Sequence, residues 1–252
     1  MDTLVNFRGL NDFTTINKQK MKPNLVFRSG ELVDIAAPER TLLFENYQIN
    51  QIYDFRSNKE ITDKPDDQFS GVDYYHIDLM RDAGGHSASL EVFASNFDGE
   101  KADDVMKDMY REIVLSQSGR EGLHNFLDGL VSHEGPAIFH CFAGKDRTGV
   151  AAALLLVSLQ VTPNQIMQDY LATNPARKVA NDAIIANYRQ TGLTEDALSV
   201  IETMLYVKQS YLEHSFATIE EHFGSIANYF KANDGLGLSS DVIAGLRNQY
   251  LA

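Results

Sequence analysis

Cysteine is scarce in this sequence of 252 residues, and its scarcity limits the covalent and metal chemistry of the protein. The single cysteine, Cys141, excludes an intrachain disulfide framework and a cysteine-rich zinc site, and it favours a reducing compartment. The first twenty residues contain no apolar segment typical of a secretory signal. We therefore expect a cytoplasmic protein, with export by a signal-independent route left open.

Long apolar runs and an excess of basic residues are also missing. The longest uninterrupted apolar run, residues 150–157, is far shorter than the roughly 18 residues needed to cross a bilayer, so we expect no stable membrane insertion. Lysine and arginine total 22 against 35 aspartates and glutamates, and the net charge of −13 argues against binding to nucleic acid. Any anion site must therefore be local.

What the sequence does contain is material for a large hydrophobic core, because 44% of its residues are apolar. The length and the lack of internal repeats favour a single domain over residues 1–252, with residues 173–252 as a helical extension packed on it. Residues 173–178 contain Asn174-Pro175 and are expected to form a break between helices.

Strand-like and helix-like segments alternate through the first two thirds of the chain. This alternation predicts an α/β fold with a central, mostly parallel sheet flanked by helices. After residue 179 only helical spacing of apolar residues remains, so the C-terminal third should be helical. The expected strands lie at residues 25–27, 52–55, 74–77 and 137–139, and the expected helices at 39–47, 103–115, 122–131, 148–159 and 163–172.

The segment around the cysteine is typical of a strand, a tight loop and a buried helix. Five residues separate Cys141 from Arg147, and residues 150–156 are apolar throughout. A short loop before a helix can turn successive backbone N–H groups inward and bind an anion. We therefore expect a phosphate-binding loop at a strand-to-helix turn, formed by Phe142, Ala143, Gly144, Lys145, Asp146 and Arg147.

Each residue type in this segment suits phosphoryl transfer. A thiolate is the strong nucleophile available near neutral pH, and N–H dipoles and a guanidinium stabilise it, so Cys141 is the expected nucleophile. The planar guanidinium of Arg147 can bind two phosphoryl oxygens at once and follow their charge into the transition state. Thr148 can stabilise the thiolate through its hydroxyl, and His140 can orient the loop.

The sequence His140-Cys141-x5-Arg147-Thr148-Gly149 resembles the signature of the cysteine-dependent protein tyrosine phosphatase superfamily. The fuller form, HCFAGKDRTG, is similar to that of a bacterial branch with a Lys-Asp pair in the loop. The resemblance implies hydrolysis of phosphotyrosine in proteins through a phosphocysteine intermediate, with dual specificity or phosphoinositide activity in some members. It extends over nearly the whole chain, through segments at residues 6–8, 27–32, 54–60, 169–171 and 223–225.

The leaving oxygen needs a proton donor, which in the resembled superfamily is usually an aspartic acid on a separate loop. Asp82 is the first candidate, because it begins a Gly- and Ser-rich segment at residues 81–101 that we interpret as a long functional loop. Asp146 is the second candidate, because it lies inside the cysteine loop itself. Asp78 is the third, at the end of an expected strand.

Charged residues near the expected loop leave two further questions open. Lys145 either adds a cation for a second phosphate group, as on a phosphoinositide, or is neutralised by its neighbour Asp146. A second group of charged residues at expected strand ends either shapes the phosphate site or braces the loops through ion pairs. This group consists of Arg28, Asp54, Arg56 and Glu60.

No histidine has the spacing of a metal ligand set, so we expect neither a metal nor another cofactor. The expected substrate is a phosphotyrosine-containing protein. Two alternatives stay open, a phosphoinositide phosphatase and a catalytically silent phosphate-binding module. The apolar stretch 204–207, with Tyr211 and Phe216, is either a lid over the site or plain core packing, and the sequence does not indicate an oligomeric state.

Overall fold

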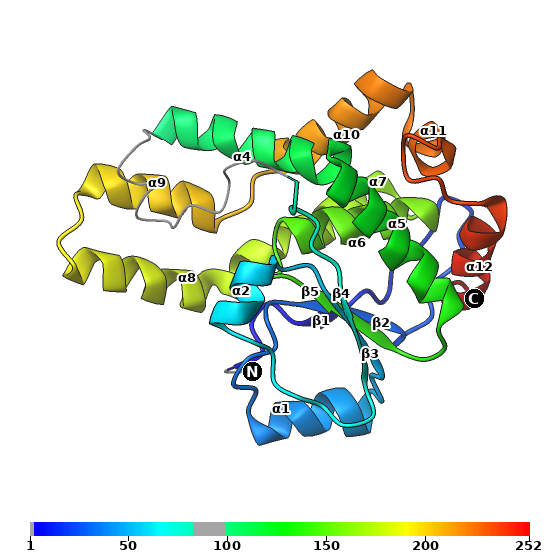
Figure 1. The fold of residues 1–252 in the computed structure, drawn as a ribbon, viewed down its shortest axis with the longest axis horizontal. Helices are drawn as coiled ribbons and strands as arrows, with labels where there is room; N and C mark the ends of the chain where they lie inside the picture. Colours follow the sequence, from blue (N-terminus) through cyan, green and yellow to red (C-terminus); the bar gives the residue numbers. More distant parts are fainter. Residues whose placement is uncertain (1–2, 83–98) are drawn as a thin grey trace.

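Five short strands form the sheet at the centre of this computed structural model, which describes residues 3–82 and 99–252. The order across the sheet is β1-β2-β5-β3-β4, and every neighbouring pair is parallel except β1 with β2 (Figure 1). The strands are β1 Arg8–Gly9, β2 Val26–Ser29, β3 Gln51–Asp54, β4 Asp73–His76 and β5 Ala137–His140.

The three central strands β2, β5 and β3 are buried on both faces, so that even the polar residues at their ends are enclosed by the protein. Phe27, Ile138 and Ile52 lie in register and pack on one face with Leu43 of the helical segment next to α1. Their chain neighbours point to the opposite face and join the larger core; these are Val26, Phe139 and Tyr53.

Helices cover both faces of the sheet (Figure 1). The segment α1–η1 lies on one side, and α5 and α6 lie on the other, below α4 and α10 in the view shown. Helices α8 and α9 pack side by side and extend away from the sheet. The helical elements are α1 Ala37–Thr41, the π-helical turn η1 Leu42–Asn46, α2 Asn58–Asp63, α4 Gly99–Leu115, α5 Gln117–Ser132, α6 Arg147–Ser158, α7 Pro163–Leu171, α8 Thr173–Gln190, α9 Glu195–Leu205, α10 Gln209–Phe223, α11 Ile226–Lys231 and α12 Ser240–Tyr250.

Helix α6 occupies the middle of the helical layer. It contacts β2 and β5 on one side and α4, α7, α10 and α12 on the others. A helix enclosed on every side must be apolar around its whole circumference, which explains the uninterrupted run at 150–157. The first residue of α6 is Arg147, so the cysteine loop leads directly into the most buried helix.

The predicted α/β class, the parallel sheet and the helical C-terminal third are confirmed. The four predicted strands and five predicted helical segments are present with small shifts of their ends, although the segment 39–47 changes from α-helix to a π-helical turn after Thr41. The two-residue strand β1 and the short helix α2 are not among the predicted elements, because neither is long enough for a periodic pattern.

The predicted break at 173–178 is wrong. Helix α7 ends at Leu171, and α8 begins at Thr173 and includes Pro175 in its first turn, where a missing N–H breaks no helical bond. The predicted loop at 81–101 also ends early, because α4 begins at Gly99; residues 83–98 lie outside the described part of the chain. Within the described residues, no helix is long and apolar enough to cross a membrane.

Candidate active site

The carboxyl ends of three parallel strands meet where the cysteine loop begins. Ser29, His140 and Asp54, the last residues of β2, β5 and β3, stand side by side in register. Residues 141–146, which we call the cysteine loop, follow His140 directly and end where α6 begins at Arg147. Ligands of open α/β sheets bind beyond this edge of the strands, so the fold places the loop where a binding site is expected.

The backbone carbonyls of the cysteine loop point outward into the surrounding protein. The Ala143 oxygen accepts hydrogen bonds from Asn6 Nδ2 (3.3 Å) and Arg177 Nη1 (3.0 Å). The Gly144 oxygen accepts from Asn6 Nδ2 and from Arg28 Nη2, each at 2.8 Å. In the described part of the chain, no N–H group of residues 142–146 donates to a protein atom. The loop therefore offers a row of free N–H donors for an anion.

Gly144 allows the loop to make its sharp turn. Its φ of +66° lies in the left-handed region, and a Cβ at this position would stand 2.1 Å from the Ser29 carbonyl oxygen. No side chain fits into so small a space, because the clashing atom belongs to the backbone of β2. Close contact of loop and strand thus depends on glycine here.

We expect Gly144→Ala to displace the loop, lowering kcat/KM for an aryl phosphate by about 100-fold and stability by about 2–4 kcal/mol. Gly71→Ala is the matched control, because Gly71 has a φ of +75° but no atom within 4 Å of the position that a Cβ would take. It should therefore show only the conformational cost of about 1 kcal/mol and full activity. Equal effects of the two substitutions on activity and on the urea midpoint would contradict the steric argument.

Cys141 is buried at the base of the loop, with 2% of its surface exposed. Arg147 and Arg177 interact electrostatically with Cys141, and Arg28 and Lys145 are further cations at the loop. Arg28, Lys145 and Arg147 each have a carboxylate partner, whereas Arg177 forms no ion pair in the described part of the chain. A buried guanidinium without a carboxylate partner favours a negative charge nearby, such as a thiolate or a bound phosphate. The site thus has a local excess of positive charge in a chain whose net charge is −13.

Arg147 is held in place by Glu60 through two parallel hydrogen bonds, Nη1 to Oε2 at 2.7 Å and Nη2 to Oε1 at 2.8 Å. Glu60 also closes the capping box of α2 with Ser57. Burial alone would raise the pKa of Glu60, but the bonds and charge of Arg147 hold it at about 2. Glu60 therefore stays ionised and orients the guanidinium through an ion pair.

Asp146 stands at the N-cap position of α6, and its carboxylate contacts Lys145 and Tyr110 rather than capping the helix. Lys145 Nζ is 2.6 Å from its Oδ2 and 2.8 Å from its Oδ1, and Tyr110 donates to Oδ1 at 2.8 Å. The Lys145 side chain is only 7% exposed, and Asp146 neutralises its charge. The Thr148 hydroxyl is fully buried and has no hydrogen-bond partner within the described residues.

Beneath the loop, Asp169 of α7 binds two arginines. It accepts from Arg28 Nη1 at 2.5 Å and from Arg8 Nε at 2.7 Å. Burial raises the pKa of Asp169, but the two guanidinium charges outweigh it and lower the pKa. Because Arg28 also binds the Gly144 carbonyl, this ion-pair cluster braces the loop from below. It joins three segments on which the family resemblance depends, at residues 6–8, 27–32 and 169–171.

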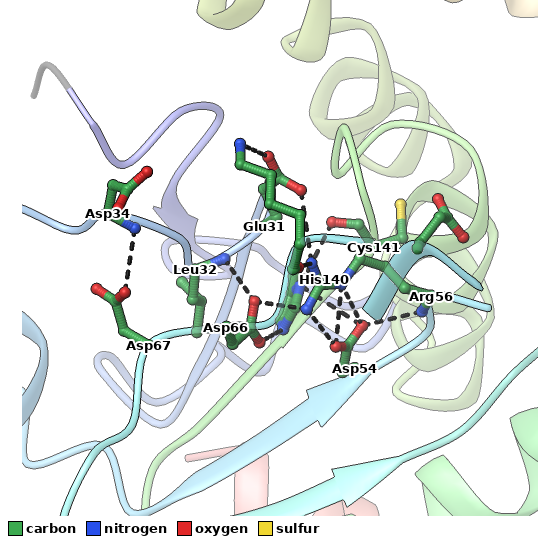
Figure 2. A network of polar contacts seen from close by, with 12 residues as sticks. Glu31, Leu32, Asp34, Asp54, Arg56, Asp66, Asp67, His140 and Cys141 are labelled. Atoms are coloured by element: carbon green, nitrogen blue, oxygen red, sulfur yellow. Dashed lines mark hydrogen bonds and ion pairs between the residues drawn. The ribbon is translucent and has the colours of Figure 1, made fainter. Parts of the chain in front are cut away.

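A second buried network lies on the other side of His140 (Figure 2). Arg56 binds both oxygens of Asp54 and donates to Asp66 Oδ1 at 2.7 Å. His140 Nε2 is 2.9 Å from Asp66 Oδ2, and His140 Nδ1 is 3.3 Å from the Cys141 carbonyl. Burial lowers the pKa of His140, but the charges of Asp54 and Asp66 more than offset it and raise the pKa. His140 thus links this network to the cysteine loop, and Arg56 and Asp54 stabilise the loop through that link.

Asp54, Asp66 and His140 approach one another closely enough to hold a metal ion. However, the Arg56 guanidinium already contacts both carboxylates and supplies the positive charge that a cation would bring. These residues therefore do not fit a metal well, and the expectation of no metal stays a prediction.

The side chain of Asp82 lies beside the first turn of α5. Its Oδ2 accepts from the Ser118 backbone N–H at 3.0 Å, and its side chain pairs with Arg81 and is 41% exposed. The hydrogen bond from Arg81 is the largest influence on the pKa of Asp82 and lowers it. Asp78 accepts from the backbone N–H of Met80 at 3.0 Å and directly precedes the turn at residues 79–82 that follows β4. Residues 83–98 of the expected acid loop lie outside the described part of the chain.

Sequence reasoning missed Asn6, Tyr110 and Arg177 as neighbours of the loop. Asn6 lies in the segment 6–8 that resembles the family, so the resemblance could have indicated it, whereas Arg177 lies in the segment 173–178, for which a break was predicted. Tyr211 and Phe216 pack against the main core, so the core interpretation of these two residues is correct, and Leu205 packs between α8 and α9.

Comparisons with known proteins agree with this geometry. The chain is 28% identical over 254 residues to a Cupriavidus necator protein that is named as a tyrosine-protein phosphatase, covering 100% of this chain and 87% of the relative. It is 27% identical over 274 residues to the triple specificity protein phosphatase PtpB of Mycobacterium tuberculosis, covering 98% of this chain and 96% of PtpB.

Among solved structures, the comparison finds TpbA of P. aeruginosa, alone and as a cysteine-to-serine variant in complex with pTyr. The identities are 13% and 12%, the TM-scores 0.30 and 0.29, and each match covers 89% of this chain and 85% of TpbA. These TM-scores are too low to establish a shared fold. The model of the tyrosine phosphatase family, in contrast, matches residues 1–252. The chain therefore belongs to the tyrosine phosphatase family.

Proposed function

We propose that this protein hydrolyses phosphotyrosine in proteins through a phosphocysteine intermediate on Cys141. The observation that carries the proposal is the cysteine loop itself, in which the Ala143 and Gly144 carbonyls find partners outside the loop while its N–H groups find none among the described residues. Cys141 lies at its base, and Arg147, oriented by Glu60, follows at its end. This combination suits binding and attack of a phosphoryl group.

In the first step, the Cys141 thiolate attacks phosphorus, and the bond from phosphorus to the tyrosine oxygen breaks. The loop N–H groups and Arg147 bind the phosphoryl oxygens, whose charge they stabilise in the transition state. An aspartic acid gives its proton to the departing oxygen. In the second step, water attacks phosphorus, the same aspartate takes the proton of the water, and Thr148 stabilises the thiolate as it leaves.

We propose Asp146 as this aspartic acid, in place of the first sequence candidate, Asp82. Asp146 is part of the loop that binds the phosphoryl group, so its carboxyl group needs no closure to reach the leaving oxygen. Asp82 accepts a backbone N–H at the start of α5 and pairs with Arg81, and both interactions favour its ionised form. Asp146 also pairs with a cation, Lys145, so the choice between the two aspartates rests on the position of Asp146 inside the loop and not on these contacts.

The second candidate function, phosphoinositide hydrolysis, needs extra cations for additional phosphate groups. The relative PtpB is named a triple specificity phosphatase, which keeps a broader substrate range open. The close pairing of Lys145 with Asp146 favours phosphotyrosine, since the lysine charge is already neutralised. We also propose that residues 1–252 act as one catalytic unit, supported by a core that runs from the sheet through α6 to α12.

The test measures kcat/KM in EDTA for a phosphotyrosine peptide and a soluble inositol polyphosphate. We expect the wild type to prefer the peptide, Asp146→Asn to lose about 10²–10⁴-fold, and Asp82→Asn to stay within about threefold. Collapse of Asp82→Asn alone would make Asp82 the acid. A preference for the inositol phosphate would support the second function, and phosphate binding without turnover would identify a silent binding module.

A further inference from the structure

Two buried tyrosines form a directed chain of hydrogen bonds that ends on Asp146. Tyr110 of α4 donates its hydroxyl proton to Asp146 Oδ1 at 2.8 Å, and its oxygen is 2.6 Å from the Tyr170 hydroxyl of α7. Because a phenol has one proton, Tyr170 must be the donor in the second bond. The chain therefore runs from Tyr170 to Tyr110 to Asp146, inside the protein, where such bonds polarise one another.

The helical layer holds Tyr110 firmly. Its ring packs edge-on against Tyr170 at 6.3 Å between centroids and against Tyr211 of α10 at 5.6 Å in a tilted arrangement. Ser215, also on α10, donates to its backbone carbonyl at 3.1 Å. Burial raises the pKa of Tyr110 well above its ordinary value, and the charge of Asp146 raises it further. The hydroxyl therefore remains a donor at every working pH.

We propose that Tyr110 is a positioning residue for proton transfer, which fixes Asp146 Oδ1 so that Oδ2 carries the proton to the leaving oxygen. This inference rests on the proposed role of Asp146. The proton passes from Oδ2 to the leaving oxygen as its bond to phosphorus breaks, and Tyr110 keeps its own proton throughout. Lys145 Nζ contacts both carboxyl oxygens, at 2.8 Å from Oδ1 and 2.6 Å from Oδ2, whereas Tyr110 bonds only Oδ1.

The experiment compares two aryl phosphates that differ in their need for an acid. Phenyl phosphate releases phenol, whose pKa is about 10 as for tyrosine, whereas dinitrophenyl phosphate releases a strongly acidic phenol that leaves unprotonated. We expect Tyr110→Phe to lower kcat/KM for phenyl phosphate about tenfold and for dinitrophenyl phosphate less than twofold. Tyr229→Phe is the matched control. The buried hydroxyl of Tyr229 donates to the carbonyl of Val114, which belongs to α4 like Tyr110, and it makes no bond to Asp146.

Each other outcome has a definite meaning. Equal losses of Tyr110→Phe on both substrates, or no loss, would overturn the positioning role, and melting temperatures of the variants would show whether packing was affected instead. Asp146→Asn run in parallel must show the same selective loss, only larger. If Asp146→Asn shows no selective loss, Asp146 is not the acid, and the proposed function fails at that residue. In that case the role of Tyr110 is overturned too. A failure of Tyr110→Phe alone leaves the role of Asp146 intact.

Discussion

Cys141→Ser should abolish hydrolysis of aryl phosphates, with a loss of at least about 10⁴-fold, and still bind inorganic phosphate. The substitution exchanges one buried atom for a slightly smaller one at a side chain that is 2% exposed, so the loop should keep its shape. A serine hydroxyl does not ionise near neutral pH and is a far weaker nucleophile than a thiolate, so only binding by the N–H groups and Arg147 survives.

The measurement is steady-state turnover together with the melting temperature at increasing phosphate concentration. Wild type and Cys141→Ser should both melt at higher temperature when phosphate binds, because a ligand that binds only the folded state stabilises it. That protection is the control for an intact loop. Turnover above about a hundredth of the wild-type rate in the serine variant would exclude a phosphocysteine intermediate on Cys141.

Arg147→Lys should lower kcat/KM by about 10²–10³-fold, although it keeps the charge. The guanidinium makes two parallel bonds to Glu60 at 2.7 and 2.8 Å and one to the Phe55 carbonyl at 3.2 Å. A lysine ammonium is a point charge and cannot bind Glu60 and two phosphoryl oxygens in this planar arrangement. Both the orientation of the residue and its contact with the transition state are therefore lost.

Arg40→Lys is the matched control for Arg147→Lys, because Arg40 also pairs with a carboxylate, Asp67, but lies at a half-exposed position on α1. Its kcat/KM should stay within about twofold, since surface ion pairs contribute little. Glu60→Gln should fall between the two, as it acts only through Arg147. If Arg147→Lys retained activity within about fivefold, bidentate binding by Arg147 would be wrong.

Much of the fold could be predicted from short-range patterns. The parallel sheet followed from apolar runs bounded by turn residues, and the buried helix α6 from its continuous apolar run. The start of α8 could not be predicted, because Asn174-Pro175 is typical of a break and equally of the first turn of a helix. Which of the two forms depends on where the preceding helix ends, and packing decides that.

The chemistry of the site is local in sequence, and so it could be read there. Cys141, Arg147 and Thr148 lie within eight positions of one another, and the loop between strand and helix brings them together whatever the rest of the chain does. Their pattern alone indicated a nucleophile, a guanidinium clamp and a nest of N–H groups.

The tertiary structure decided what supports that chemistry. Asn6, Arg28 and Arg177 reach the loop carbonyls from three distant segments, and Tyr110 reaches Asp146 from α4. These contacts arise because burying apolar faces of helices and strands brings remote residues to one strand edge, and no spacing along the chain records that packing. The proposed reacting groups could be assigned from their spacing along the chain, whereas the side chains that orient them depend on how the helices pack around α6.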